Sequence, residues 1–264
     1  DGDDAFALVA PFGLSAGPRD RRSDWARPGA DRAYVLTATS RASLRRVARA
    51  VAVGRSPVLL RWPTCAGKTT LVEYVAARLG VVCARVNNHE HTDVAEYVGR
   101  FAPEPDGSIG WRDGALTAAL HRGEWLLLDE LNLAPPDVLE ALNLAPPDVL
   151  EALNRLLDDN RELRIPETGE VVRPAPGFAL FATQNPAGVC AASGATYGGR
   201  KPLSRAFRDR FVEVHVDELS SGELADVVAR VGGVAPSLAA RLVDAHGRLR
   251  RLRLGRGRDG GSLF

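Results

Sequence analysis

The sequence predicts an α/β protein built on a parallel sheet with crossover helices. Short apolar segments, typical of buried strands, alternate along the chain with segments of helical apolar spacing. The strands are expected near 57–61, 81–86, 125–129 and 178–183, and the helices between them near 68–79, 91–100 and 114–122. Ligands of such sheets lie at the carboxyl ends of the strands, so a site is expected at that edge.

Three further helices are expected outside the strands. Residues 40–53 precede the first strand, and 220–229 and 236–245 follow the last one, each with apolar residues at helical spacing. Arginine and glycine dominate after Arg248, where no helix is expected. The expected organisation is a linker at 1–33, an α/β domain at 34–217, and an incomplete helical lid with a basic tail at 218–264.

Composition limits the classes of function. Charged residues make up 25% of the chain, the net charge is +1, and no run of about eighteen apolar residues occurs, so no membrane span is expected. The three cysteines cannot all pair with one another and no signal sequence is recognised, which favours a reducing compartment. Because the chain starts at Asp1 and contains no methionine, we expect it to be part of a longer protein.

The first strand is followed by a motif typical of a phosphate-binding loop. In that motif backbone N–H groups surround the phosphates, a lysine reaches the β- and γ-phosphates, and the next hydroxyl binds Mg²⁺. Lys68 and Thr69 match the last two positions. The expected contact residues are Pro63, Thr64, Cys65, Ala66, Gly67, Lys68, Thr69 and Thr70. Taken alone, the motif leaves a helix N-terminus without a ligand as the alternative.

One position departs from this motif. A glycine is expected five residues before Gly67, and the chain has Trp62 there. If the backbone at that point needs a positive φ or a close approach to phosphate, a side chain costs about 1–2 kcal/mol before any clash. Trp62 therefore counts against nucleotide binding.

A second motif supports the first. The apolar strand at 125–128 ends in Asp129 and Glu130, as expected of a Walker B element, and Asp129 follows Lys68 by 61 residues. Asp129 would hold Mg²⁺ through water, and Glu130 would polarise the attacking water, because phosphoryl transfer depends mostly on positioning and charge neutralisation. The alternative, an ordinary buried strand with a polar end, is disfavoured by the preceding loop.

Two later elements complete the set of a ring-forming ATPase. The strand near 178–183 ends before Asn185, which is placed to sense the γ-phosphate and to orient the attacking water. An arginine supplied in trans to a neighbouring site can raise the rate about 10³- to 10⁵-fold. Arg210 is the first candidate for this arginine finger and Arg208 the second. A basic helix end neutralised by nearby carboxylates is the alternative for each.

The order of these parts is that of an AAA+ ATPase. Several longer segments also resemble the AAA modules of the midasin family, dynein-related ATPases that remodel precursors of the large ribosomal subunit. The resemblance extends from about Tyr34 to about Leu249. It is carried by the segments 87–99, 128–135, 155–163, 165–168, 182–186 and 197–201.

This resemblance implies a nuclear mechanoenzyme of the nucleolus or nucleoplasm. Its AAA modules, on one polypeptide, would form a six-module pseudo-ring that uses Mg-ATP hydrolysis to release assembly factors from pre-60S particles. Its partners would be the neighbouring modules and the pre-60S particle, with no membrane. The family's lid supplies a further arginine to the nucleotide, and no residue here is assigned to that role. The alternatives are a structural ring module that binds nucleotide weakly or not at all, and another AAA+ chaperone or motor.

Two segments depart from the family pattern. Residues 131–141 are repeated without change as 142–152, and proline in a first turn favours a helix that starts at Pro146 of the second copy. Residues 189–196 are expected to form a looped-out surface insertion, because they are small and flexible.

Two polar clusters are given no separate site. His89 and His91 resemble metal ligands, but no other histidine or cysteine group completes a set, so a polar surface towards the central channel or a neighbouring module is preferred. The arginines after Arg248 would suit contact with ribosomal RNA, although a solvated helix end is preferred.

Overall fold

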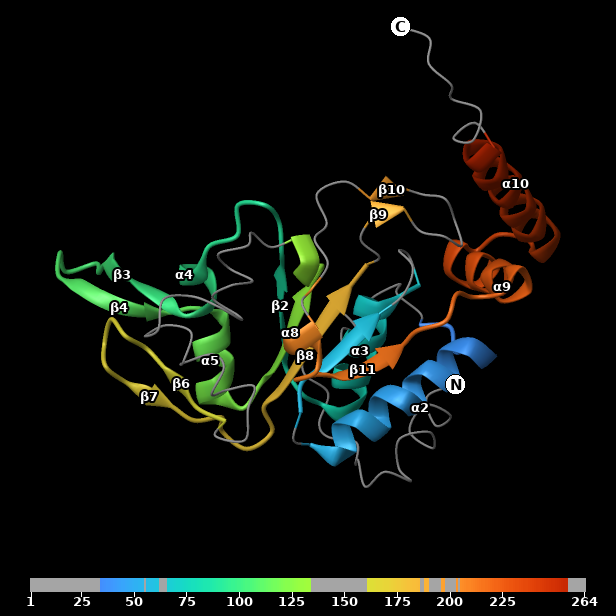
Figure 1. Ribbon diagram of the computed structural model, residues 1–264. Coiled ribbons are helices and arrows are strands. Elements are labelled where there is room, and N and C mark those ends of the chain that lie inside the picture. Colours follow the sequence, from blue (N-terminus) through green and yellow to red (C-terminus); the bar gives the residue numbers. More distant parts are fainter. Residues whose placement is uncertain are drawn as a thin grey trace, which may run out of the picture.

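A five-stranded parallel sheet forms the centre of the protein (Figure 1). The computed structural model describes residues 34–54, 56–61, 66–133, 161–185, 188–189, 196–197, 203 and 205–255. The sheet has the order β11-β1-β8-β5-β2, and all neighbouring strands run parallel. The strands are β1 (Val58–Arg61), β2 (Cys83–Asn87), β5 (Trp125–Asp129), β8 (Ala179–Gln184) and β11 (Val212–His215). The predicted α/β class is confirmed.

Helices cover both faces of the sheet, which explains why the central strands are almost continuously apolar. On one face α2 (Ala38–Val53) and α3 (Lys68–Leu79) pack against alternate residues of β1, β5 and β8. On the other face α5 (Ala115–Arg122) packs against the remaining residues of the same strands. The two faces share one sheet, so the strand ends are held in a fixed order between two apolar layers.

The helix predicted near 91–100 forms only in part. Only α4 (Val94–Tyr97) forms, and the chain then enters β3 (Gly99–Pro103), which pairs antiparallel with β4 (Ile109–Asp113). Gly99 has a φ of 133°, and a Cβ there would lie 2.5 Å from the carbonyl oxygen of Arg112. Glycine is therefore required at the first residue of β3, which lies against the end of β4.

Two other parts of the sheet region were not predicted. A second hairpin pairs β6 (Leu163–Arg164) with β7 (Val171–Val172). The edge strand β11 is only four residues long, with Val-Glu-Val-His alternation, and its apolar signal is too short to separate it from a loop.

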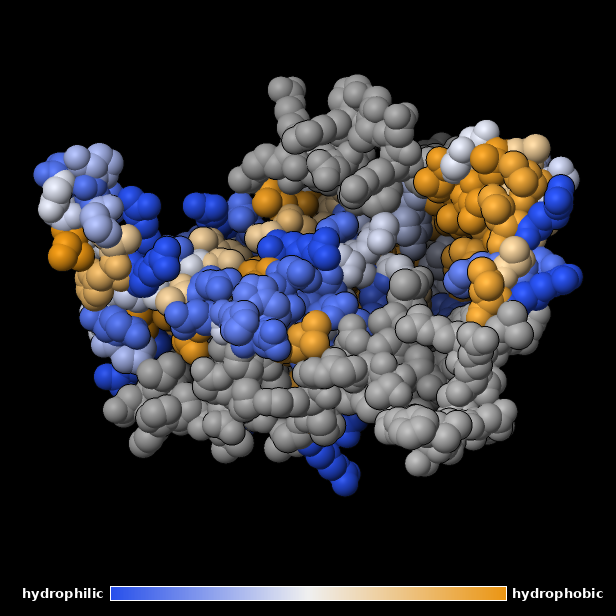
Figure 2. All heavy atoms as spheres, turned by 90° about the horizontal axis from the view of Figure 1, so that it is seen from above, coloured by the Kyte–Doolittle hydropathy of each residue, from blue (hydrophilic) through white to orange (hydrophobic). Residues whose placement is uncertain are grey.

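The predicted lid consists of α9 (Ser221–Gly232) and α10 (Pro236–Gly255), which pack against each other beside the sheet domain (Figure 1). The expectation of no helix after Arg248 is wrong, because α10 continues to Gly255. Leucine and arginine are good helix formers, and Arg248 pairs with Asp244 one turn earlier at 2.9 Å. Apolar side chains gather over α9 and α10 at the right of Figure 2, among them the exposed Val231, Leu238 and Leu242.

Several predictions fall wholly or partly outside the described residues. The linker at 1–33, the loop residues 62–65, the helix expected from Pro146 and the chain after 255 lie outside them. The repeated segment is described only at its start, where a 3-10 helix, η2 (Leu131–Leu133), follows β5. The ends of the predicted insertion pair as β9 (Gly188–Val189) and β10 (Thr196–Tyr197). None of the described helices has the length and apolar character that crossing a bilayer requires.

One carboxylate, that of Glu223, joins the start of α2 to the start of α9. Its Oε1 accepts a hydrogen bond from the backbone N–H of Thr39 at 2.8 Å, and its Oε2 accepts one from the Thr39 hydroxyl at 2.9 Å. Oε2 also accepts from the backbone N–H and the hydroxyl of Ser220, both at 2.9 Å. The backbone donors of Thr39 and Ser220, and then the hydroxyls, favour the ionised form and lower the pKa of Glu223 to about 2.

Replacing Glu223 with glutamine is expected to lower the free energy of unfolding by about 1 kcal/mol at pH 7. The expected loss is small because the Glu223 side chain is partly exposed to solvent. A lowered pKa stabilises the folded state above the unfolded-state value of 4.5, and this contribution is lost as the pH falls towards 2. Urea unfolding of both proteins at pH 7 and about pH 3 measures this difference. Asp226→Asn, an exposed change on the same helix, is the control. A difference that does not shrink at the lower pH would contradict the assignment.

Candidate nucleotide-binding site

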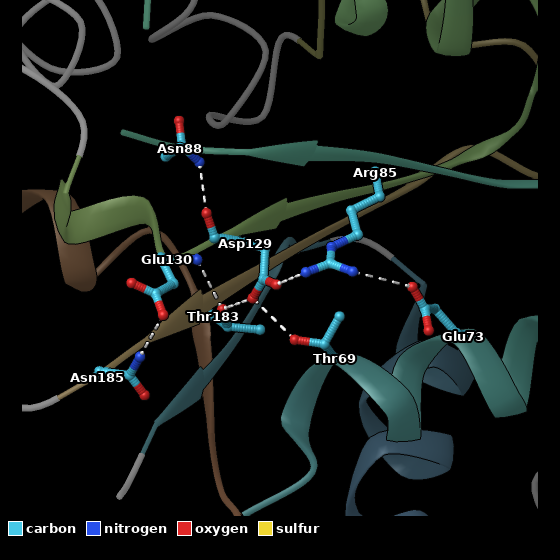
Figure 3. A network of polar contacts seen from close by, with 8 residues as sticks. All are labelled: Thr69, Glu73, Arg85, Asn88, Asp129, Glu130, Thr183 and Asn185. Atoms are coloured by element: carbon cyan, nitrogen blue, oxygen red, sulfur yellow. Dashed lines mark hydrogen bonds and ion pairs between the residues drawn. The ribbon is translucent and has the colours of Figure 1, made fainter. Parts of the chain in front are cut away.

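The structure brings five of the predicted site residues together at one edge of the sheet. Lys68 and Thr69 begin α3 after β1, Asp129 ends β5 and is followed by Glu130, and Asn185 follows β8. Because β1, β8 and β5 are neighbours in the sheet and run parallel, their carboxyl ends meet. Figure 3 shows how four of these side chains converge, Thr69, Asp129, Glu130 and Asn185.

Asn185 connects the lysine with the glutamate. The Nζ of Lys68 donates a hydrogen bond to Oδ1 of Asn185 at 2.7 Å, and Nδ2 of Asn185 donates to Oε1 of Glu130 at 3.2 Å. Asn132 donates from its side chain to the backbone oxygen of Asn185 at 2.9 Å, which fixes the start of the loop. Lys68 is only 6% exposed, so its ammonium group is directed into the site.

Both oxygens of the buried Asp129 carboxylate have partners. Oδ1 accepts hydrogen bonds from the hydroxyls of Thr69, at 2.8 Å, and Thr183. Oδ2 faces the guanidinium group of Arg85, with its Nη2 at 2.5 Å. Neither Thr183 nor Arg85 was predicted as a site residue. Thr183 lies on β8, two residues before Asn185, and this spacing is the signal that the sequence offers.

The backbone turns sharply at Glu130, which has a φ of 52°. A positive φ costs a non-glycine residue of the order of 1–3 kcal/mol, so surrounding contacts must hold it. The Glu130 N–H donates to the Thr183 hydroxyl at 2.9 Å, and the side chain of Asn88 donates to the Asp129 backbone oxygen at 2.8 Å. Asn88 in turn accepts from the hydroxyl of the buried Tyr97. These contacts aim the Glu130 carboxylate at Asn185.

The described residues fit a nucleotide with its magnesium ion. The N-terminus of α3 can direct backbone N–H groups and a positive helix dipole to phosphates, next to the ammonium group of Lys68. Gly67, before the helix, has a φ of 75°, and no atom of the described residues lies within 4 Å of a Cβ position there. The hydroxyl of Thr69 and the carboxylate of Asp129 are oxygen ligands of the kind Mg²⁺ prefers. Trp62, Pro63, Thr64 and Cys65 lie outside the described residues.

The arginine-finger candidates lie away from this site. Arg208 ends α8 (Arg205–Arg208), and Arg210 stands two residues before β11, whose first residue pairs with the first residue of β1. They therefore occupy the edge opposite Lys68, as expected of residues that serve another site. Arg208 lies 3.8 Å from Glu213, so the predicted alternative of local neutralisation applies to it in part. The trans role stays a prediction.

The histidine pair lies near the carboxyl end of β2. His89 and His91 lie in a turn after β2, with ring centroids 6.4 Å apart. Among the residues that the structure describes, no group of three or more histidine, cysteine, aspartate or glutamate side chains is placed to hold a metal ion.

Comparisons with known proteins agree with this geometry. Residues 57–145 and 142–211 match the AAA domain of the dynein-related subfamily, and the two segments overlap inside the second copy of the repeat. Protein NorQ of Paracoccus denitrificans is 35% identical over 207 residues, which cover 78% of this chain and 69% of that protein. The fold resembles the crystal structure of a proposed ATPase from Cytophaga hutchinsonii, with a TM-score of 0.52 at 17% identity, over 92% of this chain and 62% of that one.

The chain therefore belongs to the dynein-related subfamily of AAA domains, which is a class of ATPase domains. Within this subfamily it is 49% identical over 210 residues to midasin of Dictyostelium discoideum and 45% identical over 196 residues to midasin of Giardia intestinalis. These matches cover 80% and 74% of the chain, and they confirm the predicted resemblance to a midasin AAA module. The chain spans only 3% and 4% of the length of the two midasins.

Proposed function

We propose that this chain binds Mg-ATP at the edge formed by β1, β8 and β5, and that it hydrolyses ATP with an arginine from a neighbouring module. The observation that carries the proposal is the convergence of Lys68, Thr69, Asp129, Glu130 and Asn185 from three strand ends. Each of them is the residue type that phosphoryl transfer requires at that place.

Each residue would have a separate task. Lys68 would exchange its bond to Asn185 for the β- and γ-phosphates, and Thr69 and Asp129 would hold the metal. Mg²⁺ supplies charge neutralisation on the phosphate oxygens when it is bound. Glu130 would orient the attacking water and accept its proton, because the Asn185 amide holds its carboxylate at 3.2 Å. Asn185 would sense the γ-phosphate with its Nδ2 donor, which in the structure is bonded to Glu130.

The wider role rests on the resemblance to midasin. The module would stand in a six-module pseudo-ring, in which its Arg210, or Arg208, serves the adjacent site. Such a ring would act in the nucleus and use ATP hydrolysis to release assembly factors from pre-60S particles. The neighbouring modules would be its direct partners.

Calorimetry of Mg-ATP binding to the chain tests the proposal. The affinity is expected to fall by about 10- to 100-fold in Lys68→Ala, because a charge-assisted hydrogen bond contributes about 1.5–3 kcal/mol. Arg78→Ala removes a cation from the last turn of the same helix and is expected to bind as the wild type does. Circular dichroism checks that each protein is folded. A folded wild type that binds no ATP would overturn the proposal and leave a structural ring module, as Trp62 suggests.

A further inference from the structure

The carboxylate expected to hold Mg²⁺ already has a cation beside it. Arg85, on β2, places its Nη2 at 2.5 Å from Oδ2 of Asp129. The Nη1 of the same guanidinium lies 3.8 Å from Oε1 of Glu73, which is one turn after Thr69 on α3. Figure 3 shows Arg85 between the two carboxylates, on the side of Asp129 away from Glu130.

The two carboxylate oxygens of Asp129 have different partners. Oδ1 takes the hydroxyls of Thr69 and Thr183, while Oδ2 takes the guanidinium. A magnesium ion held by this carboxylate, directly or through its water, needs lone pairs of the same oxygens. It would also meet the repulsion of a positive charge a few ångströms away. The metal and Arg85 therefore compete for one carboxylate.

Glu73 offers the guanidinium a second acceptor. The Arg85 side chain is 45% exposed and that of Glu73 26% exposed. Because both side chains reach solvent, the guanidinium group can rotate towards Glu73. Asp129, in contrast, is buried, and a buried carboxylate without a cation is strongly destabilising. Arg85 therefore neutralises Asp129 when no metal is bound. Glu73 can accept the guanidinium group once the metal has replaced Arg85 at Asp129.

We propose that Arg85 sets the Mg²⁺ affinity of this site by competing with the metal for Asp129, and that Glu73 takes over the guanidinium when Mg²⁺ enters. Arg85 is then a positioning residue: it holds the Asp129 carboxylate in place before nucleotide binds and is displaced as the metal binds. This inference rests on the proposed binding of Mg-ATP.

Two variants with opposite expected effects test the inference. ATP binding to the full chain is measured by calorimetry at a fixed ATP concentration while Mg²⁺ is varied. Arg85→Gln removes the competing charge and is expected to lower the Mg²⁺ concentration for half-maximal ATP binding by about three- to tenfold. Glu73→Gln removes the second acceptor and is expected to raise that concentration by about twofold or more, because the guanidinium then stays on Asp129.

A purely structural ion pair predicts another pattern, in which both variants weaken ATP binding together. Shifts in the same direction, or no shift in either variant, overturn the inference while the wild type still binds Mg-ATP. A wild type that binds no ATP at any Mg²⁺ concentration overturns the proposed function, and this inference with it. Arg85→Lys keeps a cation with one contact fewer and is expected to shift less than Arg85→Gln in the same direction. If circular dichroism shows that Arg85→Gln does not fold, Arg85→Lys serves as the test in its place.

Discussion

Replacing Phe181 with alanine is expected to lower the free energy of unfolding by about 4 kcal/mol. Phe181 is fully buried in the central strand β8, and its ring lies 4.7 Å from the ring of Trp125 on β5. Removing it leaves a cavity between the sheet and the α2–α3 layer, which α2 and α3 cannot fill without moving. Since whole domains are stable by about 5–15 kcal/mol, this single change removes a large part of the total.

Urea unfolding followed by circular dichroism measures the change. Phe101→Ala is the matched control, because the same atoms are removed from a side chain that is 54% exposed on the β3–β4 hairpin. The control is expected to cost less than about 1 kcal/mol. Equal losses in the two variants would show that Phe181 does not lie in the core of the α/β domain.

Replacing Glu130 with glutamine is expected to reduce ATP hydrolysis by about 10²- to 10⁴-fold while Mg-ATP binding stays within about threefold of the wild type. Glutamine has the same shape and can still accept the hydrogen bond from Asn185 through its oxygen. It cannot take a proton from water, so the loss falls on the chemical step. A reduced rate with unchanged affinity identifies an interaction made only in the transition state.

Single-turnover hydrolysis with the protein in excess over ATP measures this effect, since a second copy of the chain can then offer its arginines. Glu90→Gln makes the same chemical change on a side chain that is 84% exposed, and its rate should match that of the wild type. If Glu130→Gln hydrolyses ATP as fast as that control, Glu130 is not the catalytic base.

The sheet and most of the site could be predicted because both depend on local patterns. Strands buried on both faces are continuous apolar runs, and a polar residue directly after such a run marks the edge where ligands bind. Asp129 and Asn185 follow this rule at the ends of β5 and β8, and Lys68 begins the helix that follows β1. The structure brings these three residues together, as the motif spacing predicts.

What could not be predicted depends on contacts between distant segments. Arg85 reaches Asp129 because β2 lies beside β5, and this strand order is not visible in either segment alone. The β3–β4 hairpin depends on Gly99, whose role is apparent only when Arg112 is seen to lie against it. The extension of α10 is not evident from the sequence, because an arginine-rich segment suits a solvated tail as well as a helix.

The parallel pairing of β1 with β11 places two different edges at opposite ends of the same pair of strands. These strands are hydrogen-bonded in parallel over four residues, which is about 13 Å, with the phosphate-binding edge after one end and the arginines before the other. A ladder of this kind resists sliding, so the separation between these two edges is fixed. If Arg210 or Arg208 acts on a neighbouring site, as proposed above, the two edges of one subunit would face different neighbours, and the ring would have one rotational sense.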